Sequence, residues 1–259
     1  MPTVKLPDAE LYYEFSGPEG APILVLSNSL GTNLHIWDGQ IADFTKHFRL
    51  LRYDTRGHGK SSVTPGPYSL AQLSNDVLHL LDALQLSQVY FCGVSMGGMT
   101  AMFLGIHSPS RFNKIVACSA AAKIGTPESW NARIDAVKKD GMKAVASAVI
   151  ERWFTLTFRT THPAEMARMQ AILENANPDG YIANCAAVRD MDLRDSLTAI
   201  NIPALIISGT YDPGTTPADG RYLAEHIPVS RFFEIAASHI SNIEAQIVFN
   251  REVLSFLLA

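Results

Sequence analysis

Residues 91–98 read Phe91-Cys92-Gly93-Val94-Ser95-Met96-Gly97-Gly98, and the architecture of the chain can be predicted outward from them. Residues 88–92 are rich in aromatic and β-branched side chains, which is typical of a short buried strand. Residues 96–107 are mostly small and apolar and contain no proline, a pattern that predicts a helix. A serine between such a strand and helix, with a glycine two residues away on either side, is the G-x-S-x-G pattern of a nucleophile elbow. We therefore expect Ser95 to occupy a strained turn, with its hydroxyl exposed beside the positive end of a helix.

Strand and helix patterns alternate on both sides of this turn. The uninterrupted apolar run at residues 22–26 is typical of a strand buried on both faces of a parallel sheet. Residues 70–84 place leucine and valine side chains along one face of a helix. The other strands are expected at residues 4–6, 11–15, 49–53, 114–118, 204–208 and 231–235, and the other helices at residues 37–48, 217–227 and 243–258. This order predicts an α/β fold with a mostly parallel, eight-stranded sheet and helices on both faces.

Between about residues 120 and 199 the strand patterns stop. Proline stands near the starts of several helical stretches there, as it does at the first turn of helices. These stretches are residues 128–139, 142–152, 164–175 and 179–190. The block therefore predicts an all-helical cap inserted into the fold. With no repeat or linker in evidence, we expect residues 1–259 to form a single domain that carries this insertion.

The composition limits the partners and the compartment. The 259 residues are 47% hydrophobic and 18% charged, with a formal net charge of −4. This balance gives no electrostatic reason to expect nucleic acid or an anionic membrane as a partner. We see no targeting segment and no apolar run of about 20 residues. Cys92, Cys118 and Cys185 are scattered without metal-ligand spacing, so we expect reduced core thiols, a cytoplasmic location and no metal.

A nucleophilic serine needs an imidazole that takes its proton, and the imidazole needs a carboxylate that fixes its tautomer. In the predicted fold, the order along the chain is serine, acid, histidine, each in a loop at the C-terminal edge of the sheet. Asp212 follows the strand at residues 204–208 and is the candidate acid. His239 follows the last strand and precedes the last helix, and is the candidate base.

Other acids and histidines are less well placed for these roles. Acids in the helical block are interpreted as solvated charges: Asp190, Asp192 and Asp195. Four of the eight histidines fall in or at the ends of predicted helices: His47, His79, His107 and His226. His35 and His58 lie in loops near the catalytic edge, where they are candidates for substrate contact.

The backbone must supply an oxyanion hole, two N–H groups aimed at the developing negative charge. We expect one from Met96, next to the nucleophile, and the other from Leu30 in the loop after residues 22–26.

The segment Gly57-His58-Gly59-Lys60-Ser61 ends like a phosphate-binding loop. However, Asp54 stands where that motif needs a glycine, and prolines intervene where its helix should begin. We interpret the segment as a structural turn in which Asp54 and Arg56 can pair.

Four stretches carry a family resemblance: residues 27–32 with Trp37-Asp38, residues 51–59, residues 91–99 and residues 237–244. These four stretches resemble the 3-oxoadipate enol-lactonases. The chain also resembles the wider α/β-hydrolase superfamily in its set of four motifs: residues 93–97, residues 54–61, residues 210–213 and Ser238-His239. Many hydrolases of this fold have His-Gly in the oxyanion loop, whereas Asn28-Ser29 in this chain matches the enol-lactonase pattern. The resemblance implies hydrolysis of 3-oxoadipate enol-lactone to 3-oxoadipate in bacterial protocatechuate or catechol degradation. It also implies an acyl-enzyme on Ser95 and no cofactor.

The implied substrate bears a carboxylate, which a pocket desolvates favourably only if the charge is paired. The helical block offers six arginines: Arg133, Arg152, Arg159, Arg168, Arg189 and Arg194. Arg133 follows Trp130 by three residues and can share a helix face with it, and Arg152 adjoins Trp153. We predict substrate contacts from Trp130, Arg133 and Trp153, with cap packing and surface charge as the alternative interpretation.

Several alternatives stay open. A carboxylesterase, a cofactor-free haloperoxidase-like enzyme and a carbon–carbon bond hydrolase of this fold would share the triad. The presence of all three triad residues disfavours a non-catalytic ligand receptor. The sequence leaves the choice between monomer and homo-oligomer open.

Overall fold

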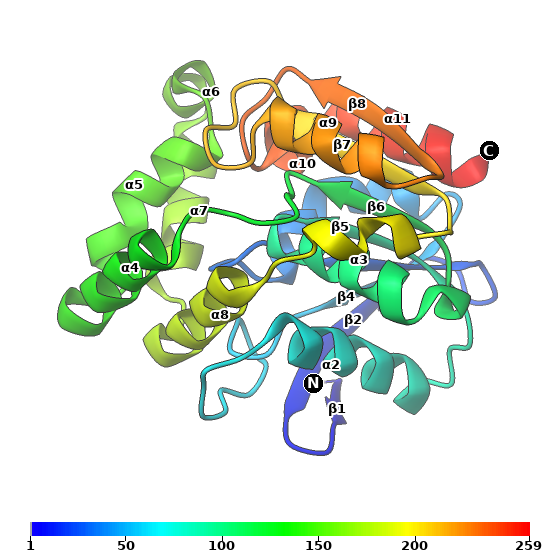
Figure 1. The fold of residues 1–259 in the computed structure, drawn as a ribbon, viewed down its shortest axis with the longest axis horizontal. Helices are drawn as coiled ribbons and strands as arrows, with labels where there is room; N and C mark the ends of the chain where they lie inside the picture. Colours follow the sequence, from blue (N-terminus) through cyan, green and yellow to red (C-terminus); the bar gives the residue numbers. More distant parts are fainter. Residues whose placement is uncertain (1) are drawn as a thin grey trace.

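The computed structural model describes residues 2–259, which form an eight-stranded sheet flanked by helices (Figure 1). The strands are β1 (Thr3–Lys5), β2 (Glu10–Ser16), β3 (Ile23–Ser27), β4 (Arg49–Tyr53), β5 (Val89–Val94), β6 (Phe112–Cys118), β7 (Ala204–Gly209) and β8 (Ser230–Ile235). Their spatial order is β1-β2-β4-β3-β5-β6-β7-β8. Strands β3 to β8 pair in parallel, whereas β2 pairs antiparallel with both β1 and β4. The prediction of a mostly parallel, eight-stranded sheet is thus confirmed.

Helices cover both faces of this sheet because its central strands are apolar on both sides. The helices α2 (Leu70–Ala83), α3 (Met96–His107) and α9 (Pro217–His226) lie over one face, and η2 (Pro109–Arg111) follows α3. The elements η1 (Leu34–Gln40), α1 (Ile41–Phe44), α10 (Ser241–Glu244) and α11 (Gln246–Leu258) pack together on the other face. No helix within residues 2–259 is long and apolar enough to cross a membrane.

A helical insertion separates β6 from β7 and forms the left side of Figure 1. It contains α4 (Pro127–Asp140), α5 (Lys143–Trp153), α6 (Leu156–Thr161), α7 (Pro163–Glu174) and α8 (Pro178–Asp190), and η3 (Arg194–Ala199) leads back to the sheet. Helix α6 was not predicted, since its six residues are too short to show a clear helical period. We call α4–α8 the cap.

Two other predicted helices differ in form from the expectation. Residues 37–48 are not one α-helix, because η1 is a 3-10 helix and α1 ends at Phe44. The next residue, Thr45, caps it, and its hydroxyl donates to the Ile41 carbonyl. The closing helix is interrupted at Ala245, whose backbone angles (φ −123°, ψ 43°) are not helical.

The predicted pairing of Asp54 with Arg56 is wrong. The Arg56 guanidinium is buried and lies 2.6 Å from carboxylate oxygens of both Asp76 and Asp8. The Asp54 carboxylate instead packs against Gly59, where a Cβ would overlap it. There it accepts the backbone N–H groups of Leu34 and Lys60, each at 2.8 Å.

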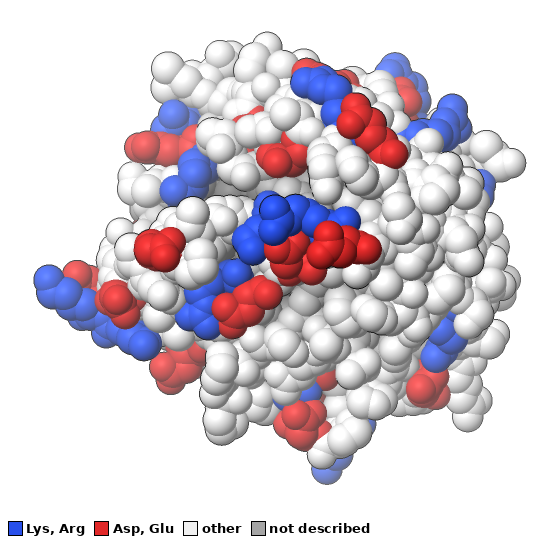
Figure 2. Space-filling model, viewed as in Figure 1, with Lys and Arg blue, Asp and Glu red and all other residues white. Residues whose placement is uncertain are grey.

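Acidic and basic side chains alternate over the face of the molecule seen in Figure 2. Oppositely charged side chains also pair locally in the molecule, and Asp192 contacts both Lys123 and Arg194. This intermingling agrees with the small net charge of −4.

Candidate active site

Ser95 stands in the turn between β5 and α3 with φ 58° and ψ −117°. Its N–H donates to the carbonyl of Cys118 at 2.8 Å, and this bond holds the turn against β6. A side chain at Gly93 would overlap the backbone of Gly97, and one at Gly97 would overlap the carbonyl of Ser27. The two glycines therefore permit the close backbone approach that presents the serine at the edge of the sheet.

The loops after β7 and β8 bring Asp212 and His239 together. The Nδ1 atom of His239 lies 2.6 Å from Oδ2 of Asp212, which is 3% exposed. The other carboxylate oxygen accepts the N–H groups of Gly214 and Thr215, and the Thr215 hydroxyl donates to Oδ2. Burial tends to raise the pKa of Asp212, but the charge and hydrogen bond of His239 and these donors together hold it below its ordinary value. The acid is thus an ionised partner for the imidazole.

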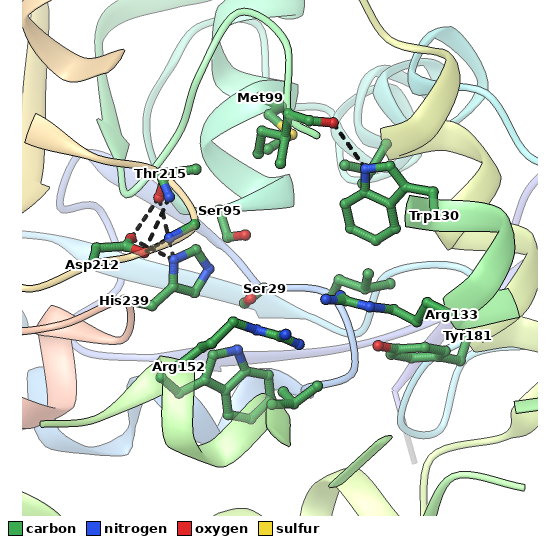
Figure 3. Close-up of a pocket in the computed structure, with 16 residues that line it drawn as sticks. Ser29, Ser95, Met99, Trp130, Arg133, Arg152, Tyr181, Asp212, Thr215 and His239 are labelled. Carbon is green, nitrogen blue, oxygen red and sulfur yellow. Dashed lines mark hydrogen bonds and ion pairs between the residues drawn. The ribbon is translucent and has the colours of Figure 1, made fainter. Parts of the chain in front are cut away.

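Ser95 and His239 line the same pocket and lie close together in Figure 3. Within residues 2–259 no hydrogen bond is formed by the Ser95 hydroxyl, and catalytic contacts of this kind are often longer without substrate. The structure thus brings together the three residues that the order serine, acid, histidine singled out.

The loop at residues 28–32 also lines the pocket, through Ser29 and Leu30. Asn28 fixes its start, since its amide donates to the Tyr53 carbonyl and accepts from the indole of Trp37. Leu30 lines the pocket. Within residues 2–259, neither the Leu30 N–H nor the Met96 N–H has an acceptor, so both are free to bind an oxyanion.

The cap closes the pocket from the far side, and three predicted contacts line it: Trp130, Arg133 and Trp153. The Arg133 guanidinium lies 4.6 Å from the centre of the Trp130 ring, and the Trp130 indole donates to the carbonyl of Ile124. Figure 3 shows the guanidinium groups of Arg133 and Arg152 directed toward one another, on the side of the cavity that faces the serine and histidine.

These two guanidinium groups carry uncompensated charge. Neither Arg133 nor Arg152 forms an ion pair within residues 2–259, and both are half-buried. Burial, together with the nearby charge of Arg133, lowers the pKa of Arg152. Burial also raises the pKa of Tyr181, which lies beside them, to about 12, so its phenol stays protonated. A ligand with a negative charge would relieve the repulsion between the two arginines.

The other four arginines of the helical block have acidic partners: Arg159 with Glu151, Arg168 with Glu165, Arg189 with Asp190 and Arg194 with Asp192. They lie outside the pocket lining. His35 and His58 also do not line it, since His35 pairs with Asp38 at the surface and His58 is buried. Within residues 2–259, no group of three or more His, Cys, Asp or Glu side chains could hold a metal ion.

Sequence reasoning did not select Arg152 or Tyr181. Arg152 was one of six arginines, and its only distinguishing signal was its position beside Trp153 at the end of a helix. Tyr181 lies in the first turn of α8 and reaches the pocket because Gly180 packs against the backbone of Gly57. That contact joins residues far apart in sequence, and no local pattern indicates it.

The chain is similar to known proteins in both sequence and structure. A family model described as alpha/beta hydrolase fold matches residues 22–246. The chain is 44% identical to 3-oxoadipate enol-lactonase 2 of Acinetobacter baylyi over 97% of this chain and 94% of that one. It is 42% identical to 3-oxoadipate enol-lactonase 1 of the same organism over 90% and 88% of the two chains. The crystal structure of the enol-lactonase from Burkholderia xenovorans LB400 superposes with a TM-score of 0.98 at 44% identity and covers 100% of both chains.

Proposed function

The chain belongs to the α/β-hydrolase family, within the group of the 3-oxoadipate enol-lactonases, and we propose that it hydrolyses 3-oxoadipate enol-lactone to 3-oxoadipate. One observation carries this proposal. The guanidinium groups of Arg133 and Arg152, which have no acidic partner within residues 2–259, line the same pocket as Ser95 and His239. A neutral ester gives such charges no partner, whereas a lactone that bears a carboxylate does.

In the first half of the proposed reaction, Ser95 attacks the ring carbonyl while His239 takes the hydroxyl proton. Asp212 keeps the imidazole in the tautomer whose Nε2 can accept that proton, since it binds Nδ1 at 2.6 Å. The N–H groups of Leu30 and Met96 bind the oxyanion as the tetrahedral centre forms. Collapse of this centre breaks the ring C–O bond.

The ring oxygen leaves as an enolate that stays tethered to the acyl group. It takes the proton that His239 holds, directly or through water, and the resulting enol then ketonises, which leaves His239 neutral again. In the second half, His239 takes a proton from water as the water attacks the acyl carbon. Collapse releases the new carboxylic acid and returns the proton to Ser95. The sum is one lactone and one water converted to one open-chain keto diacid.

We propose that Arg133 and Arg152 bind the carboxylate that the substrate carries throughout, with Trp130 and Trp153 packing against its apolar part. An arginine beside an aromatic ring keeps its planar fork in one orientation, which suits two parallel hydrogen bonds to a carboxylate. We also propose a cytoplasmic location, because all three cysteines are buried free thiols.

The test compares freshly generated 3-oxoadipate enol-lactone with p-nitrophenyl acetate as substrates for the wild type, Ser95→Ala and the surface control Ser87→Ala. We expect kcat/KM for the lactone to exceed that for the ester by several orders of magnitude. We expect Ser95→Ala to lower both by about 10⁴-fold or more, with the control unchanged. Equal, weak turnover of both substrates would refute the lactone assignment, and activity that survives Ser95→Ala would refute the mechanism.

A further inference from the structure

The turn at residues 54–61 lies against the loop at residues 28–32, which we call the oxyanion loop. This turn resembles a phosphate-binding loop only in its last residues. Asp54 accepts the N–H of Leu34, just beyond that loop, at 2.8 Å. His58 accepts the N–H of Gly31, inside the loop, at 2.8 Å through its Nε2 atom. The turn therefore supplies hydrogen-bond acceptors to the neighbouring loop.

The hydrogen bond from Gly31 requires a neutral imidazole at His58. Nε2 can accept only when it carries no proton, so the ring proton must be on Nδ1. His58 is 2% exposed, and burial lowers its pKa to about 4. Its Nδ1 faces the carbonyl of Arg56 at 3.4 Å, and the Asn184 amide of cap helix α8 donates to the same carbonyl at 2.8 Å.

The peptide groups on both sides of Leu30 are held in place. The Ser29 carbonyl and the Leu30 N–H belong to the same peptide group. Because that group is planar and trans, the two bonds lie in one plane and point in opposite directions. The Ser29 carbonyl accepts both the backbone N–H and the hydroxyl of Thr32, at 3.1 and 2.7 Å, which orients that plane. The next peptide ends in the Gly31 N–H, which His58 binds.

Gly31 itself is confined between the turn and the cap. Its φ is +80°, and a Cβ there would press on Leu173 of α7 and Tyr181 of α8. The loop therefore has His58 on one side and cap side chains on the other. Among residues 2–259, His58 is the hydrogen-bond acceptor for the Gly31 N–H.

We propose that His58 is a positioning residue of the oxyanion hole, whose imidazole holds the Gly31 N–H and so directs the Leu30 N–H into the pocket. This inference rests on the serine-hydrolase chemistry proposed above, but not on which ester is the substrate. Loss of the acceptor should impair stabilisation of the tetrahedral state and leave substrate binding intact.

The experiment compares His58→Gln, whose side-chain carbonyl can accept where Nε2 does, with His58→Leu, which has no acceptor. His47→Leu, at an exposed position, is the control. With p-nitrophenyl acetate and with the lactone, we expect His58→Leu to lower kcat by about 10- to 100-fold with KM nearly unchanged, and His58→Gln to recover most of it. The inhibition constant of phenylboronic acid, which forms a tetrahedral adduct on the serine, should rise by the same factor in His58→Leu only.

Each outcome bears on the inference. Active-site titration gives the concentration of functional sites in each variant, so that kcat is calculated per folded molecule. Equal losses in the two His58 variants, or unchanged boronic acid affinity in His58→Leu, would overturn it. If His58→Leu does not fold, His58→Asn decides, because its shorter side chain places no acceptor where Nε2 stands. It should lower kcat without raising KM, and an unchanged kcat and boronic acid affinity would overturn the inference. If the wild type hydrolyses the acetate ester but not the lactone, and His58→Leu lowers kcat for the acetate ester, the inference is supported while the lactone assignment is refuted.

Discussion

The hydroxyl of Ser238 donates a hydrogen bond of 2.7 Å to the carbonyl oxygen of Arg152. This contact joins the loop that carries His239 to the end of cap helix α5. A second bond runs parallel to it, from the N–H of Ile240 to the carbonyl of Trp153 at 3.1 Å. The proposed base and two residues of the pocket wall are therefore fixed relative to each other through the backbone.

Glu244 reinforces this junction, and its removal should weaken both the fold and substrate binding. Its carboxylate accepts the N–H of Ser238 at 2.8 Å, and the N–H and hydroxyl of Thr155. Glu244→Ala leaves these donors without an acceptor, so we expect the free energy of unfolding to fall by about 1–3 kcal/mol. KM for the lactone should rise more than KM for p-nitrophenyl acetate, because Arg152 and Trp153 lose their fixed position. Urea unfolding and steady-state kinetics would test this, with exposed Glu225→Ala as control. Unchanged unfolding and KM in Glu244→Ala would contradict it.

The two pocket arginines should act on binding and not on the chemical step. A hydrogen bond to a charged group contributes about 1.5–3 kcal/mol, so Arg133→Ala and Arg152→Ala should each raise KM for the lactone by about 10- to 150-fold. Turnover of p-nitrophenyl acetate should change little, since that ester has no carboxylate. Arg194→Ala, which removes a paired surface arginine, is the matched control. A large fall in kcat with unchanged KM would place these arginines in the chemical step instead.

The parts of this molecule that could be predicted from sequence are those with local patterns. The strands follow from apolar runs, and Ser95, Asp212 and His239 follow from their order and their positions after strands. Arg152 and His58 could not be assigned in this way. Neighbouring residues of a helix point in directions about 100° apart, so choosing Trp153 did not select Arg152. The partner of His58, Gly31, is 27 residues away in sequence, and only the folded chain shows which loop the turn supports.

The buried ion pair between Arg56 and Asp76 should be a large source of stability. Arg56 is 1% exposed and Asp76 is 3% exposed, whereas the second partner, Asp8, lies at the surface. Asp76→Ala would leave a buried guanidinium without its buried partner, which costs about 3–5 kcal/mol. Asp8→Ala removes an exposed carboxylate from the same arginine and should cost about 1 kcal/mol or less. Urea unfolding of the two variants measures the difference, and similar losses in both would contradict this account.

The burial of His58 should make stability depend on pH in a range where few other side chains titrate. Burial lowers its pKa from 6.5 to about 4, so the unfolded chain binds a proton between these values and the folded chain does not. The stability linked to this group is therefore complete above about pH 6.5 and is lost progressively as the pH falls toward 4, by up to about 3 kcal/mol. The free energy of unfolding in urea, measured at intervals from pH 7 to 4.5, should fall more steeply for the wild type than for His58→Gln. The exposed control His79→Gln should keep the wild-type slope. Equal slopes in the wild type and His58→Gln would show that His58 is not held neutral by the fold.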